Sequence, residues 1–555
     1  MLLVRVWIWG GLLWGTFVAA QRDCGDTLGT LSGDAVRKAG KLFLEPLVSA
    51  DRLEDTAEIL YYTTVFDVQV VKLCSSCERL AESLFEEGRE PVNLFYQSYC
   101  GPESYGYIAP LSGLAFLPLD PTTGELLHKT KLRTFVSLGT SGDKTVPTEA
   151  WPDNFGQFVD SVLLGQTDQH DFQFLMSEFL PALVAATSGS IGYLPDYHGY
   201  GRSTEWADRT VFWPQMYTQV AMVGWLHLAE YVRERTLGCT LVEKAVTLRG
   251  IEDGAFAIPF VMDAMRRFDI KILKAFMDAG PLDLQTFLVD TFQAYGTGSV
   301  SLAMRELLPS TTFTYSSDID GVPNANTGDR MVTDTFASEL LQWYRSPDPV
   351  PSTEISLLVP ADERDVVKPE FRELLQSGGP SPCQTSPDDA LCHAILDASG
   401  YQLLFNESYA LSFPFDICFS PEDEVFTANH YPEAMFDNDL VTKYEGPLGA
   451  PHLAPQGPHF KVRQYCSLQS MLFYNLEGHV PDAPVDRPNY FSRLNELEME
   501  VCLNELASLD EVDSTPEDTT AGDPEGVQDT ERSSGVLATE TLVAMMLAIF
   551  SYVAW

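Results

Sequence analysis

The chain has 555 residues and a formal net charge of −44, from 79 acidic and 35 basic residues. Such a charge opposes binding to nucleic acid or anionic lipid and indicates a solvated acidic surface. The length, once both ends are set aside, suits an α/β core that carries an inserted cap.

The first 20 residues predict a signal peptide (1–20) for the secretory pathway. Arg5 precedes an apolar run, and the small residues Val18 and Ala20 stand before a cleavage site at Gln21. The run is shorter than the ~20 residues that cross a bilayer, so an uncleaved anchor is the less favoured alternative.

Apolar strand patterns alternate with helical periodicity from about residue 57 to 270, which is typical of a sheet covered by helices on both faces. The fold class predicted is therefore α/β, with a doubly wound, mostly parallel sheet. Expected strands are Ile59–Val71, Tyr107–Leu117, Lys131–Leu138 and one that starts at Gly192. Helical patterns cover Leu180–Ile191, which ends in a turn, and Pro214–Arg235.

Residues 246–257 predict a buried strand, a tight turn and the start of a helix, with Glu252 at the tip of the turn. Gly250 and Gly254 flank this tip, where small residues let neighbouring backbone close around a strained residue. The layout is that of a nucleophile elbow, Gly-x-Ser-x-Gly, except that Glu252 stands at the serine position.

The strand–helix rhythm breaks at residues 275–405, where Gly, Pro and Ser are scattered among amphipathic segments. This composition predicts an inserted, mainly helical cap, with helices near Leu284–Ala294, Ser299–Leu308 and Thr333–Tyr344. Strand patterning resumes at Leu411–Phe419. The core is thus expected in two parts, 22–274 and 406–507.

A hydrolase with such an elbow needs an oxyanion loop, an acid and a histidine in chain order. Gly139 and Thr140 follow a buried strand and are candidates for the oxyanion loop, with the backbone N–H of Asp253 as the second donor.

Asp423 follows an apolar strand and is the candidate acid, although aspartates are common in turns. His459 is the candidate histidine; a surface or structural role is its alternative, and His452 is the nearest competitor.

Three motifs in this order resemble the secreted lipase/esterase branch of the α/β-hydrolase superfamily. They are the loop that starts at Gly192-Tyr-Leu-Pro-Asp-Tyr-His-Gly, the elbow of Gly250–Gly254, and Phe419-Ser-Pro-Glu-Asp-Glu-Val. The resemblance covers roughly residues 40–270 and 410–475. It implies an α/β-hydrolase fold with an eight-stranded-type sheet, a helical lid and ester or acylglycerol substrates.

Glu252 at the serine position leaves two functional hypotheses. In the first, the protein is a pseudo-hydrolase that binds a small apolar or acyl ligand, with Glu252 paired to His459. In the second, the protein is an active hydrolase in which Glu252 is a carboxylate nucleophile supported by His459 and Asp423, as an aspartate is in dehalogenases and epoxide hydrolases. Residual esterase activity is included in this second hypothesis. Ser141 or Ser190 as a replacement nucleophile ranks last, because neither lies in an elbow motif.

Ten cysteines in a secreted chain predict disulfides, whose connectivity the spacing does not reveal. Cys74 and Cys77 have the spacing of half a zinc site or a redox pair, but a structural role, with Cys100 as a plausible partner, is favoured. No metal or cofactor is expected. Asn406 begins a glycosylation sequon.

The end of the chain resembles a glycosylphosphatidylinositol (GPI) signal. Residues 508–535 are acidic and poor in large apolar side chains, which predicts a disordered stalk. Residues 536–555 end in an apolar tail without a basic anchor, and Ser533 or Ser534 is the expected attachment residue. The alternatives are a transmembrane helix and a buried helix. The protein is thus expected at the extracellular face of the plasma membrane.

Overall fold

The computed structural model describes residues 27–31 and 67–76, much of the chain from 110 to 300, and shorter segments from 301 to 467. Gaps within the better described part include residues 140–146, 151–177 and 202–210. Several predicted features lie outside the described residues: the signal peptide, the stalk, the hydrophobic tail, Cys77, Cys100, Thr140, Ser141, Asn406, His452, Ser533 and Ser534.

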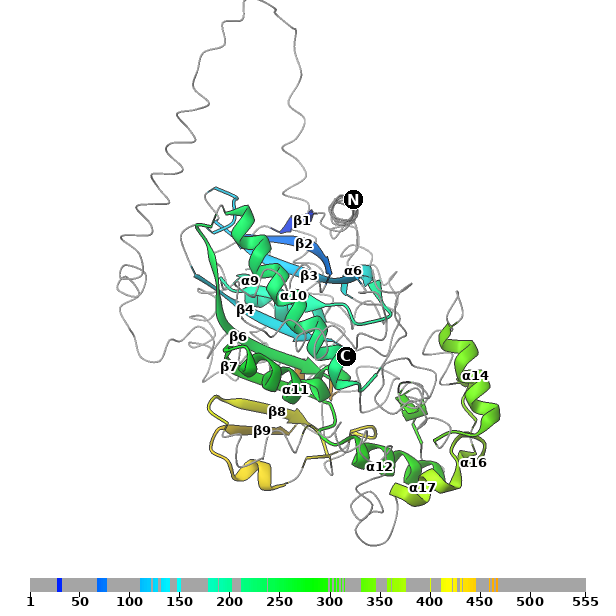
Figure 1. Cartoon of the computed structure of the whole chain (residues 1–555). Helices are drawn as coiled ribbons and strands as arrows, with labels where there is room; N and C mark the ends of the chain where they lie inside the picture. The colour runs from blue at the N-terminus through cyan, green and yellow to red at the C-terminus, as the bar shows by residue number, and fades with distance from the viewer. Residues whose placement is uncertain are drawn as a thin grey trace, which may run out of the picture.

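A nine-stranded sheet lies at the centre of the molecule, in the order β1-β2-β3-β5-β4-β6-β7-β8-β9 (Figure 1). The strands are β1 (Thr27–Leu31), β2 (Asp67–Ser76), β3 (Pro110–Leu119), β4 (Lys131–Leu138), β5 (Ile191–Pro195), β6 (Leu241–Ile251), β7 (Lys271–Asp278), β8 (Phe415–Phe419) and β9 (Val441–Glu445). The ladders among β1, β2, β3 and β5 are antiparallel, and the others are parallel. The predicted mostly parallel sheet is therefore confirmed, with one strand more than the resemblance implies.

Helices pack on both faces of the sheet, as a doubly wound fold requires. A Cβ on Gly192 of β5 would lie 2.2 Å from the carbonyl oxygen of Ala182 in α9 (Leu180–Thr187). A Cβ on Gly224 of α10 (Pro214–Arg235) would lie 1.6 Å from the hydroxyl of Tyr193, the next residue of β5. Because successive residues of a strand face opposite ways, α9 and α10 cover opposite faces.

The helix α11 (Asp253–Arg267) follows β6 directly and packs beside α10. Most of its apolar residues are buried, among them Phe256 and Met262, which are fully buried. Shorter elements are α6 (Pro147–Ala150) and the 3-10 helix η7 (Glu433–Asp437). The bounds of β4 and α10 are those predicted from the sequence.

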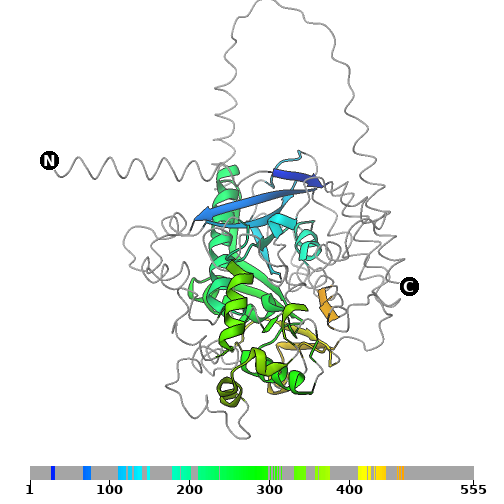
Figure 2. The same cartoon turned by 90° about the vertical axis from the view of Figure 1, so that its right-hand side faces the viewer.

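The insertion between β7 and β8 is mainly helical where it is described. It contains α12 (Leu284–Thr297), α14 (Asp334–Arg345), α16 (Glu363–Val366) and α17 (Pro369–Leu375). Phe292 of α12 packs edge to face on Phe371 of α17, with ring centroids 5.6 Å apart. These helices lie beyond the carboxyl ends of the parallel strands, on the side to which the arrows point (Figures 1 and 2).

Several predicted element boundaries differ from the structure. The strand expected at Leu411–Phe419 begins only at Phe415, and the buried strand β7 continues to Asp278, past the expected end of the first core segment at residue 274. The early strand is β2, and it extends beyond the predicted end at Val71, because Lys72–Ser76 continue the ladder with β3 although Lys72, Ser75 and Ser76 are polar. Among the described residues, no helix is both long and apolar enough to cross a membrane.

Candidate functional site

Glu252 occupies a strained turn between β6 and α11. Its backbone has φ 52° and ψ −116°, a region that costs a non-glycine residue of order 1–3 kcal/mol. The turn is held because the N–H of Glu252 donates to the carbonyl of Asp278 (3.0 Å) and its own carbonyl accepts from Phe256 N–H (3.0 Å). The sharp strand–turn–helix predicted from the sequence is therefore present.

Glycines let the surrounding backbone close on this turn. A Cβ on Gly250 would lie 2.2 Å from the carbonyl oxygen of Gly254, and one on Gly254 would lie 2.3 Å from that of Leu138. Gly280, which the sequence analysis did not single out, is equally constrained, since its Cβ would lie 2.0 Å from the carbonyl oxygen of Glu252.

The structure brings Glu252, His459 and Asp423 together at this turn. His459 Nε2 lies 2.8 Å from Glu252 Oε1, and His459 Nδ1 lies 3.0 Å from each carboxylate oxygen of Asp423. Asp423 is fixed by the backbone N–H groups of Val425 and Phe426, both of which donate to its Oδ1. The imidazole thus links two carboxylates that lie far apart in the sequence.

These carboxylates determine the charge of His459. Burial alone lowers the pKa of the ring, but Asp423 and Glu252 raise it by more, and the net result is a pKa of about 10. His459 is only 2% exposed, so solvent does little to screen this effect. At neutral pH the ring is an imidazolium that donates to both carboxylates.

Arg463 is a second cation on Glu252 that was not predicted from the sequence. Its Nε lies 2.8 Å from the same Oε1 atom that His459 contacts. His459 and Arg463 have i and i+4 spacing on a helical segment, so they share one helix face. That spacing is the sequence signal that could have identified Arg463.

Glu178 is a further acidic residue of the site that no motif indicated. It is fully buried just before α9, in a π-type turn at residues 178–179. Arg463 Nη2 lies 3.8 Å from its Oε1, and neither carboxyl oxygen accepts a hydrogen bond from the described residues. Burial, opposed by Arg249 and Arg463, raises the pKa of Glu178 to about 7.

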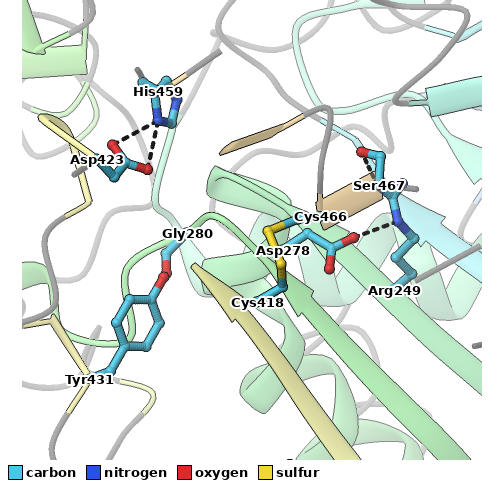
Figure 3. The surroundings of a disulfide bond; sticks show 9 residues. All are labelled: Arg249, Asp278, Gly280, Cys418, Asp423, Tyr431, His459, Cys466 and Ser467. Atoms are coloured by element: carbon cyan, nitrogen blue, oxygen red, sulfur yellow. Dashed lines mark hydrogen bonds and ion pairs between the residues drawn. A yellow bond between two sulfur atoms is a disulfide. The ribbon is translucent and has the colours of Figure 1, made fainter. Parts of the chain in front are cut away.

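A disulfide and a buried arginine attach the segment that carries His459 and Arg463 to the sheet (Figure 3). Cys418 at the end of β8 is bonded to Cys466. Arg249 of β6, which is fully buried, donates to Asp278 (2.8 Å) and to Ser467 (2.7 Å). The spacing of the cysteines could not have revealed this pairing, because ten cysteines allow many connectivities.

The expected oxyanion loop begins beside the elbow. Gly139 is buried, and its carbonyl accepts a hydrogen bond from the Tyr197 hydroxyl (2.6 Å). Asp253 is the first residue of α11, and its side chain accepts from the Tyr217 hydroxyl (2.6 Å). Gly139, which follows β4, and Asp253, which follows β6, therefore both lie near the turn at Glu252.

Other sequence candidates do not join this site. Ser190 immediately precedes β5, at the amino end of a strand parallel to β4 and β6, whereas Glu252 follows the carboxyl end of β6. It is therefore excluded as a replacement nucleophile. Cys74 is paired in β2 through its backbone. Across the described ranges, no His, Cys, Asp and Glu side chains are grouped to hold a metal ion.

No protein-family model matches the chain, and no match is found among curated proteins. Among solved structures, a single-site mutant of the rice cell wall degrading esterase LipA from Xanthomonas oryzae matches with a TM-score of 0.50 and 14% identity, over 81% of this chain and 96% of that chain. A ligand-bound form of LipA has the same TM-score and identity, over 80% and 95%. At such identity the likeness shows the fold alone: the chain has an α/β-hydrolase fold.

Proposed function

We propose that this chain is a secreted, membrane-tethered relative of the lipases and esterases that does not turn over esters, and that binds a small apolar or acyl ligand instead. Glu252 occupies the position of the nucleophilic serine. The observation that carries the proposal is the double contact of Glu252 Oε1, which lies 2.8 Å from both His459 Nε2 and Arg463 Nε.

This geometry opposes each step of ester hydrolysis. A histidine that is already an imidazolium cannot accept a proton from a nucleophile or from water. A carboxylate that attacks an ester forms an anhydride no more stable than the substrate, and its negative charge opposes a neighbouring oxyanion. Glu252 is also occupied by two cations, which stabilise it as an ion pair.

The ligand class rests on the fold and on the resemblance of the motifs. LipA is an esterase with a ligand-bound structure, and the likeness to it spans most of the chain. Secretion and the lipid anchor rest on the sequence of the two ends. Release of the protein from cells by a phosphatidylinositol-specific phospholipase C tests the anchor, and retention on the cells would count against it.

A carboxylate nucleophile is the second candidate, because Glu252 projects from the strained turn at which nucleophiles stand in this fold. In that mechanism Glu252 attacks an alkyl carbon, displaces a leaving group and forms an ester, which His459-activated water hydrolyses. The imidazolium form of His459 disfavours the second step.

The test compares the purified full-length wild type with the E252Q and E252S variants on p-nitrophenyl butyrate, an epoxide and a haloalkane, and measures binding of a fluorescent fatty acid. We expect no wild-type turnover and saturable binding of the fatty acid. Wild-type turnover that E252Q abolishes would establish the carboxylate mechanism. Replacement of the exposed Glu125 by Gln is the control for loss of one charge.

A further inference from the structure

The carboxyl of Glu178 lies directly against the loop expected to stabilise an oxyanion. A Cβ built on Gly139 would lie 2.2 Å from Glu178 Oε2 and 2.9 Å from its carboxyl carbon. Only a glycine leaves room for this approach. The acid therefore packs on the backbone of Gly139 rather than facing solvent.

Glu178 is also coupled to the other side of the site. The charges of Glu252 and Asp253 both act on its carboxyl, and Asp253 is the residue whose N–H is the second expected oxyanion donor. Glu178 thus contacts Gly139, one of the expected donor residues, and interacts electrostatically with Asp253, the other. Its oxygens accept no hydrogen bond from the described residues, although it is fully buried.

We propose that Glu178 is a second inactivating residue, whose carboxyl opposes the negative charge that ester hydrolysis would develop beside Gly139. This inference rests on the proposed function, since it explains why the site is inactive independently of Glu252. A restored serine alone would then be insufficient.

The charge of Glu178 changes near neutral pH. Burial raises its pKa to about 7, Arg249 and Arg463 oppose that rise, and Glu252 and Asp253 add to it. Tyr197 also faces it, and the Glu178 charge raises the pKa of that phenol. Glu178 is thus neutral below its pKa of about 7 and anionic above it.

This pH range conflicts with the one that a serine–histidine mechanism needs. In an E252S variant the serine oxygen would attack the ester carbonyl, its proton would pass to neutral His459 and then to the departing alcohol, and water would cleave the acyl-enzyme. Without Glu252, the pKa of His459 falls below its wild-type value of about 10 and the pKa of Glu178 falls below about 7, because the charge of Glu252 raises both in the wild type. Glu178 is then anionic at neutral pH and above, where this mechanism needs a neutral His459.

The experiment compares kcat/KM for p-nitrophenyl butyrate in full-length E252S and E252S/E178Q across pH 6 to 10. We expect the double variant to be at least about tenfold more active above pH 8, comparable to part of the effect of one oxyanion donor. The E252S/E125Q variant should behave like E252S. Thermal unfolding of each variant monitors folding.

A second measurement needs no active variant. Infrared spectra of the wild type with ¹³C-labelled glutamate, minus those of E178Q, should show a protonated carboxyl at pH 6 that disappears by pH 8. Equal activity of E252S and E252S/E178Q at every pH, or a Glu178 carboxyl that is still protonated above pH 8, would overturn the inference. Turnover by the wild type would instead refute the proposed function, so the two failures are distinguishable.

Discussion

The charge of His459 makes protein stability depend on pH in a defined direction. Its pKa is 6.5 as an ordinary imidazole and about 10 in the folded protein, so between these values the folded state holds a proton that the unfolded state has released. The stabilisation is complete below pH 6.5 and is lost as the pH rises through the folded value. The free energy of unfolding should fall by roughly 1.4 kcal/mol per pH unit in this range.

Urea unfolding at pH 7.5 and 9 measures this loss with little contribution from Glu178, which titrates at about pH 7. Over this interval the wild type should lose about 2 kcal/mol more than H459Q does, because the variant lacks the titrating ring. The H459Q variant is less stable at both values, but only the difference in slope matters. Equal slopes would mean that His459 is neutral, which would refute the proposed ion-pair network.

Two further predictions concern the framework of the site. Replacing both Cys418 and Cys466 by alanine should reduce the free energy of unfolding by about 4 kcal/mol, as expected for a disulfide that links residues 48 apart. In urea unfolding, a reductant should therefore destabilise the variant by about 4 kcal/mol less than it destabilises the wild type, because the variant has already lost this bond. Gly254→Ala should cost more than about 3 kcal/mol, because the new Cβ meets the Leu138 carbonyl at 2.3 Å. Gly238→Ala, where no atom lies within 4 Å but φ is +83°, measures the cost of backbone strain without a clash, and an equal loss of thermal stability in both would contradict the reasoning.

Local patterns were sufficient to predict the elements that position Glu252. The β6 strand, the turn and α11 follow from a buried apolar run, flanking glycines and helical periodicity, all of which are short-range signals. The convergence of Asp423 and His459 on Glu252 was anticipated only through chain order in a resembling family. Their distances and charges required the folded chain.

The remaining features of the site and of the sheet depend on contacts between residues far apart in the chain, which a single sequence does not reveal. Glu178 lies outside any motif, and its importance arises because the turn before α9 places it against Gly139. The short edge strands β1 and β9 are defined by pairing with their neighbours rather than by their own periodicity. Arg463 differs, because its helical spacing from His459 was visible.

Nitrogen NMR of the His459 ring at pH 8 tests the ion-pair network most directly, with H459Q used to assign the signals. Both ring nitrogens should carry a proton, as expected for an imidazolium between Asp423 and Glu252. The E252Q variant should shift the titration of this ring to lower pH, because one of the two carboxylates is then neutral. A ring with one unprotonated nitrogen at pH 8 in the wild type would contradict the network, and the ready base of a hydrolase would be present after all.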